Sequence, residues 1–220
     1  MDNYFNVIYK RTNLQYDYKL VKYLIDRFDI KTGSKLLDVG CGYGKHLHHF
    51  RQEGIEGYGL DIRYHGRYIQ KCDVSTDRFP YEDEYFDFIF SKSLLEHIQN
   101  PDNFIQESYR ILKKGGTIII LVPDWKSQLK HYWDDYTHCH AWTYKSLKDF
   151  LLINNFKNVG CEYFYQLPFV WECRYLKFIP KTISILPDRL KWKTKDMRNG
   201  EDRKLIRFSK ELMLLGWGRK

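Results

Sequence analysis

With 220 residues and a mass of 26.8 kDa, the chain is long enough for one α/β domain with a full core. Its net charge of +8 suits anionic partners. An aromatic content of 17% excludes a disordered chain, and a mean hydropathy of −0.58 without an apolar run of about 18 residues excludes a membrane-spanning one. The N-terminus lacks the pattern of a secretory signal, and the five cysteines form no Cys-x-x-Cys pair, which predicts free thiols in a reducing cytoplasm.

The first half of the chain alternates helical and strand patterns. Apolar residues on one helical face predict an amphipathic helix over residues 17–29. A short apolar run that ends in glycines predicts a buried strand at 35–39, and a helix is expected at 44–52. Further strands are expected at 57–61, 69–72 and 86–90.

The second half continues the alternation. A helix with Pro101 in its first turn is expected to be capped by Asn100 and stopped by Gly115-Gly116. A β-branched strand is expected at 117–122, a helix from Thr143 to about 154, and strands at 158–164 and 205–216. This order predicts a parallel sheet covered on both faces, with its ligand at the carboxyl ends of the strands.

Three features at those ends predict a nucleoside-containing ligand. Gly40 and Gly42 let the backbone approach a ligand closely in the turn after the first strand. Asp61 ends the next strand, nineteen positions after Gly42, where a carboxylate can accept two hydrogen bonds from a ribose diol. Asp73 ends the third strand, where it can take the exocyclic amine of an adenine.

The same turn argues against a nicotinamide dinucleotide. That fingerprint requires a third glycine at the position of Lys45 and an apolar residue in place of Asp38. A carboxylate just before the turn would repel a pyrophosphate, but it suits the ammonium group of a methionine moiety.

The pattern resembles the class I S-adenosylmethionine-dependent methyltransferases, in particular the group that modifies small molecules. The matching segments, spread over residues 34–124, are LLDVGCGYG, GLDI, KCDV, FPYEDEYFDFIFSKSLLEHI and ILKKGGTIIILVPD. The resemblance implies a Rossmann-like three-layer sandwich whose seven-stranded, mostly parallel sheet has an antiparallel last strand. It also implies S-adenosylmethionine as cofactor. Asp38 would hold the methionine amino group, Asp61 the ribose, and Asp73 with Val74 the adenine, and the full set expected at the cofactor is Asp38, Gly40, Cys41, Gly42, Asp61, Ile62, Asp73, Val74 and Ser91.

A loop rich in histidine and aspartate, residues 131–143, is expected to overhang the acceptor pocket. Its D-x-T-H stretch before a Trp-Thr helix start resembles methyltransferases of polysaccharide and glycan gene clusters. An alcohol acceptor needs a base, and the candidate is His138, oriented by Asp135 or another carboxylate. The alternative is that His138 bonds a backbone carbonyl and fixes the loop.

A metal site is a second option. Glu96-His97 resembles part of the E-x-x-E-H motif of magnesium-dependent O-methyltransferases, in which His138 could supply a later ligand. Ser93 replaces the first glutamate and removes one ligand, so we expect no metal. His97 is then expected to line the catalytic pocket.

The segment from 168 to about 200 separates the last two predicted strands and mixes aromatic with basic residues. Between Arg174 and Arg207 the sequence has eleven Lys and Arg residues but four Asp and Glu residues. It can be a helical cap over the edge of the sheet, which we favour, or a lid over a phosphorylated acceptor, a homodimer contact or a surface that approaches a membrane.

These patterns together predict a cytoplasmic O-methyltransferase, a single domain over 1–220, acting on a small polar or anionic acceptor such as a nucleotide-linked or phosphorylated sugar of surface-polysaccharide biosynthesis. The alternatives are a small-molecule N-methyltransferase, an RNA methyltransferase, for which no RNA-binding motif is evident, and a protein that keeps the fold only for binding.

Overall fold

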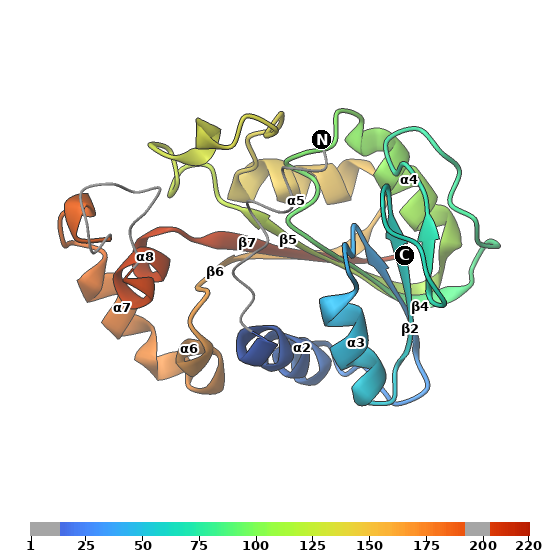
Figure 1. The fold of residues 1–220 in the computed structure, drawn as a ribbon, viewed down its shortest axis with the longest axis horizontal. Coiled ribbons are helices and arrows are strands. Elements are labelled where there is room, and N and C mark those ends of the chain that lie inside the picture. The colour runs from blue at the N-terminus through green and yellow to red at the C-terminus, as the bar shows by residue number, and fades with distance from the viewer. Residues whose placement is uncertain (1–13, 192–202) are drawn as a thin grey trace.

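The computed structural model describes residues 14–191 and 203–220 and contains one seven-stranded sheet between two layers of helices (Figure 1). The strand order is β3-β2-β1-β4-β5-β7-β6, and β7 runs in the direction opposite to that of the other six strands. The predicted fold class is therefore confirmed. The strands are β1 (Lys35–Val39), β2 (Glu56–Asp61), β3 (Ile69–Lys71), β4 (Phe86–Lys92), β5 (Leu112–Pro123), β6 (Lys157–Phe164) and β7 (Met213–Arg219).

Helices bury both faces of this sheet. α2 (Leu14–Phe28) and α3 (Lys45–Gln52) cover one face, and α4 (Pro101–Ile111) and α5 (Tyr144–Ile153) cover the other (Figure 1). Side chains of successive strand residues point to opposite faces, so Leu36 packs in the core under α2 while Leu37 packs in the core under α4 and α5. Two buried faces explain the uninterrupted apolar runs Phe88–Phe90 in β4 and Ile118–Val122 in β5.

The helix boundaries follow local signals in part. Thr143 begins α5 with a capping box, since its Oγ1 accepts a hydrogen bond from the Ser146 amide and the Ser146 Oγ accepts one from the Thr143 amide. The prediction that Asn100 caps α4 is wrong in its side-chain contact, because Asn100 Nδ2 donates to the Ser75 carbonyl instead. α4 also ends before Gly115, since Leu112 is already extended and begins β5.

The last predicted strand, 205–216, is wrong in its first half. Lys204–Lys210 form helix α8, and β7 begins only at Met213. Bonds between residues four apart stabilise this turn of helix: Ser209 Oγ donates to the Leu205 carbonyl, and Arg207 Nε donates to Glu211 at 2.7 Å.

The described part of the segment between β6 and β7 is helical and lies at the β6–β7 end of the sheet (Figure 1). It contains α6 (Pro168–Glu172), α7 (Phe178–Ile183) and two short 3₁₀ turns, Arg174–Lys177 and Asp188–Lys191. The aromatic rings of Trp171 and Phe164 stack at 5.0 Å, which joins α6 to β6. The rest of the predicted insert, with Trp192, and the first 13 residues of the chain lie outside the described residues.

Among residues 14–191 and 203–220, every helix is too short or too polar to cross a lipid bilayer.

Gly160 gives a test of the β6–β7 pairing. A Cβ atom at Gly160 would lie 2.1 Å from Trp217 Cζ2 on the neighbouring strand. We expect Gly160→Ala to lower the free energy of unfolding by about 1–3 kcal/mol, because the indole must shift or the strands must separate. Urea unfolding measures this change. Gly66→Ala is the matched control, since a Cβ there meets no atom within 4 Å; an equal loss in both variants would contradict the explanation.

Candidate functional site

The carboxyl ends of β1, β2 and β4 meet at one edge of the sheet, and a glycine turn follows β1 there. Gly40, Gly42 and Gly44 have φ angles of 76°, 53° and 73°, a left-handed backbone that glycine adopts without steric cost. A Cβ at Gly40 would lie 2.8 Å from a Leu94 methyl group, whereas one at Gly42 would meet nothing within 4 Å. The turn is therefore packed on one side and open at Gly42, where a ligand can approach the backbone.

Asp61, at the end of β2, holds the open turn in place. Its Oδ2 accepts a hydrogen bond from the Gly42 amide at 2.9 Å, and its Oδ1 accepts bonds from the amides of Arg63 and Tyr64 at 2.9 and 3.1 Å. These bonds fill three of about four acceptor positions of a carboxylate. The remaining position is the one available to a ligand hydroxyl.

Asp38, at the end of β1, is a buried carboxylate without a partner for one of its oxygens. Its side chain is 2% exposed, and Oδ2 makes no hydrogen bond to the described residues. Burial, and secondarily the charge of Asp61, raise the pKa of Asp38 to about 7. A buried acceptor of this kind is costly alone and favours a cationic ligand group, so it fits the predicted ammonium.

The other predicted cofactor residues lie around the same edge. Asp73 follows β3, is partly exposed, and accepts a bond from the Ser75 amide at 2.9 Å. Ser91 is fully buried and its Oγ donates to the Val39 carbonyl at 3.1 Å, so its hydroxyl is committed to β1. Cys41 and Val74 are buried, and Ile62 is an exposed apolar side chain directly after Asp61.

A polar cluster on the α2 side of this edge was missed from the sequence. Lys92 ends β4 and lies near the carboxylates of Asp38, Glu96 and Asp17, and burial lowers its pKa. Asp17 of α2 in turn pairs with His46 of α3, with Oδ1 and Nε2 3.4 Å apart. A lysine two positions after the apolar run of β4 is the one sequence signal that could have indicated this cluster.

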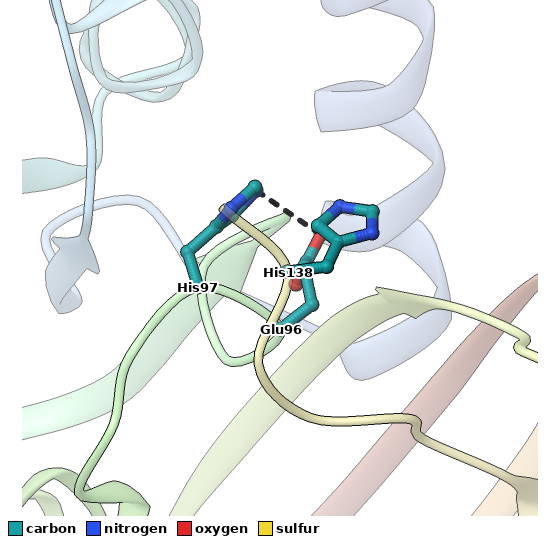
Figure 2. Close-up of side chains that lie close together, drawn as sticks. All are labelled: Glu96, His97 and His138. Carbon is teal, nitrogen blue, oxygen red and sulfur yellow. Dashed lines mark ion pairs between the residues drawn. The ribbon is translucent and has the colours of Figure 1, made fainter. Parts of the chain in front are cut away.

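On the other side of the edge, His97 and His138 face each other, with ring centroids 4.8 Å apart (Figure 2). His138 Nδ1 donates to the Tyr132 carbonyl at 2.6 Å. His97 Nδ1 lies 2.8 Å from Thr137 Oγ1, whose single proton is donated to Asp135 Oδ1, so His97 Nδ1 is the donor of that pair. In its neutral form, each ring therefore carries its proton on Nδ1 and leaves Nε2 as an acceptor.

These contacts correct the expected partner of His138. His138 Nδ1 donates its hydrogen bond to a main-chain carbonyl, which is the contact that the alternative for this residue predicted. The Asp135 carboxylate is bonded to Thr137 instead. Asp135 therefore acts on His97 through Thr137. Burial, and then the neighbouring His138, lower the pKa of His97, which keeps this ring neutral.

Glu96 lies beneath the two rings, and its Oε1 is 3.9 Å from His97 Nε2, the dashed contact in Figure 2. Its Oε2 is buried without a described partner, and burial raises the pKa of Glu96 to about 8. One ligand atom from each of Glu96, His97 and His138 lies within 4.8 Å of the others, so these three residues have the geometry to hold a metal ion. Ser93 offers only a hydroxyl where a further carboxylate would complete such a set.

Comparisons with known proteins agree with this arrangement. A family model described as "Methyltransferase domain" matches residues 11–160. Phosphoethanolamine N-methyltransferase 2 of Caenorhabditis elegans is 29% identical over 158 residues, which are 63% of this chain and 36% of the relative. The chain thus spans about a third of that curated relative's length.

Two solved structures show the same fold. A SAM-dependent methyltransferase from Archaeoglobus fulgidus has a TM-score of 0.62 and 21% identity, covering 92% of this chain and 94% of its own. Haemonchus contortus phosphoethanolamine N-methyltransferase 2, in complex with phosphomonomethylethanolamine and S-adenosylhomocysteine, has a TM-score of 0.60 and 16% identity, covering 91% of this chain and 52% of its own.

The raised pKa of Asp38 predicts a pH-dependent stability. A carboxyl group with a pKa near 3.9 in the unfolded chain and about 7 in the folded one binds its proton more tightly when folded. The contribution of Asp38 to the free energy of unfolding therefore falls as pH rises from about 4 to 7. Relative to the wild type, Asp38→Asn should gain on the order of 1–4 kcal/mol in the free energy of unfolding between pH 4 and 8. Urea unfolding without ligand measures this, and Asp26→Asn, an exposed change on α2, is the control. A gain that does not depend on pH would contradict the assignment.

Proposed function

The chain belongs to the methyltransferase-domain family, and we propose that it transfers a methyl group from S-adenosylmethionine to a small polar acceptor deprotonated by His138. The observation that carries the acceptor chemistry is the tautomer of His138, whose Nδ1 is committed to the Tyr132 carbonyl and whose Nε2 is left as a base.

The residues at the sheet edge fit this cofactor. Asp38, with its unpartnered buried oxygen, would hold the ammonium group, and the open backbone of Gly40, Cys41 and Gly42 would lie against the ligand. Asp61 would accept a ribose hydroxyl at its remaining acceptor position. Ile62, Asp73 and Val74 would contact the adenine, and Ser91 would position β1 beside the methionine end through its bond to Val39. When bound, the cofactor supplies an electrophilic methyl group on a sulfonium.

The acceptor is then aligned and deprotonated by residues on the side of the sheet edge where His97 and His138 lie. Methyl transfer is an in-line displacement, so holding the acceptor is a large part of the catalysis. The acceptor's proton passes to His138 Nε2, and the Tyr132 carbonyl stabilises the resulting imidazolium at Nδ1. His97, held by Thr137 and Asp135, supplies a second neutral acceptor beside the first.

A hydroxyl group is the acceptor that most needs such a base, because an unassisted alcohol is a weak nucleophile at neutral pH. We therefore propose O-methylation of a sugar, nucleotide-linked or phosphorylated, as the first candidate. The names of the relatives favour a second candidate, the amine of a phosphorylated amino alcohol. Such an amine arrives protonated and also gives up a proton before transfer.

Removing the base gives the first test. We expect His138→Ala to lower kcat on a hydroxyl acceptor by about 10²–10⁴-fold, the usual contribution of a general base, with little change in cofactor affinity. Release of S-adenosylhomocysteine measures the rate, and calorimetry measures binding. His131→Ala is the control, because His131 lies in the same loop but pairs with the exposed Asp134. Equal losses in both variants would indicate that the loop, and not the base, is disturbed.

A panel of acceptors with and without EDTA separates the remaining candidates. Nucleotide sugars, phosphorylated alcohols, phosphoethanolamine and tRNA are offered to the wild type. We expect turnover on one of the small molecules, at a rate that EDTA does not change. Turnover on phosphoethanolamine would select the amine, and turnover on tRNA alone would overturn the small-acceptor proposal. A metal held at Glu96, His97 and His138 would take the place of the base in the proposal if three results coincide. EDTA would abolish the activity, a divalent cation would restore it, and Glu96→Gln would be inactive even with that cation.

A further inference from the structure

The segment between β6 and β7 carries an exposed apolar stripe. Tyr175, Phe178 and Ile185 are 90%, 62% and 83% exposed. Tyr175 lies in the 3₁₀ turn Arg174–Lys177, which runs directly into α7, and Phe178 is the first residue of α7. Ile185 lies two residues beyond the end of α7, in a turn whose amides bond back to the carbonyl oxygens of Pro180, Thr182 and Ile183. Leu186 extends the stripe by one partly exposed side chain.

Polar contacts on the inner side hold this stripe in place. Lys210 of α8 donates to the carbonyl oxygens of Ser184 and Leu186 at 2.6 and 2.8 Å. Asp188 pairs with Lys210 at 3.2 Å and with Lys130 at 2.8 Å. The apolar side chains are therefore displayed by an anchored segment, and the Lys130 contact ties that segment to the chain leading into the His138 loop.

The charge around the stripe is positive. Lys177, Lys181 and Arg189 flank it, and within the described residues none of the three is in an ion pair with a carboxylate. Asp188, an acidic residue next to the stripe, is already paired with two lysines. Apolar side chains bordered by unneutralised cations match a surface that is apolar inside and anionic outside.

We propose that this stripe docks the protein on an anionic phospholipid surface, with Phe178 and Ile185 inserted among the headgroups and the flanking cations at the phosphates. A row one side chain wide is too narrow for a stable protein interface, which buries about 800 Å² on each partner. It is sufficient for an interfacial helical segment lying flat on a bilayer. The proposal does not depend on the acceptor or on the base assigned above.

Vesicle co-sedimentation tests the proposal with the full chain. Vesicles of phosphatidylcholine containing roughly 30 mol% phosphatidylserine are compared with pure phosphatidylcholine. We expect the wild type to bind the anionic vesicles at least about tenfold more tightly, and to release them as salt is raised. The double variant Phe178→Ser, Ile185→Ser should lose at least about tenfold in this binding. Lys181→Glu should lose about fivefold or more.

Ile153→Ser is the matched control, because Ile153 is 77% exposed on α5, outside the stripe. It should bind anionic vesicles like the wild type. Failure of the wild type to bind, equal binding to both vesicle types, or equal losses in the control and the double variant would overturn the proposal. Sedimentation velocity gives the remaining outcome: a wild-type dimer that the double variant converts to a monomer would assign the stripe to a second copy of the chain instead.

Discussion

The parallel register of β1 with β2 and β4 is the constraint on which the candidate site depends. It sets Asp38 opposite Gly59 and Phe90, and Val39 opposite Leu60 and Ser91, so the acidic and basic side chains at the strand ends are brought within one or two rows of each other. Main-chain bonds fix the backbone of these residues, so their side chains can separate only by changing rotamer. Asp38 is thereby held in an environment that disfavours its charge, and a cationic ligand group relieves that cost.

The acceptor side depends on the main chain in a different way. The Glu96 carbonyl accepts the Cys139 amide at 2.7 Å, which fixes the histidine-containing loop over the turn that follows β4. One short segment therefore supplies His97, supports the backbone that carries His138 and buries a neutral carboxyl beneath both rings. The loop and the sheet edge are joined by a main-chain hydrogen bond, which can form whatever side chain stands at position 96. The chemistry of the site depends instead on the side chains at positions 96 and 97.

The sequence predicted the features that local patterns encode. The bounds of β1, the glycine turn and Asp38 were available from one strand–turn–helix motif, and Asp61 was available from its place at the end of the next strand. The cluster of Asp17, His46 and Lys92 was not, because its members come from three elements separated along the chain and share no spacing. The alternation in 205–216 fits a strand and a short helix equally, and only packing against α7 decides between them. The partner of His138 depends on how the loop folds back, which no pattern in the loop specifies.

The insertion of β7 between β5 and β6 has a consequence for the order in which the chain folds. β6 is joined to the described sheet only through β7, whose residues follow it in the sequence by about fifty positions. During synthesis β6 therefore leaves the ribosome without a neighbour to pair with, and β5 presents a free edge, until Met213–Arg219 have been made. The sheet closes when β7 pairs with both β5 and β6, and we expect this pairing to form late and slowly because it joins residues far apart in the sequence.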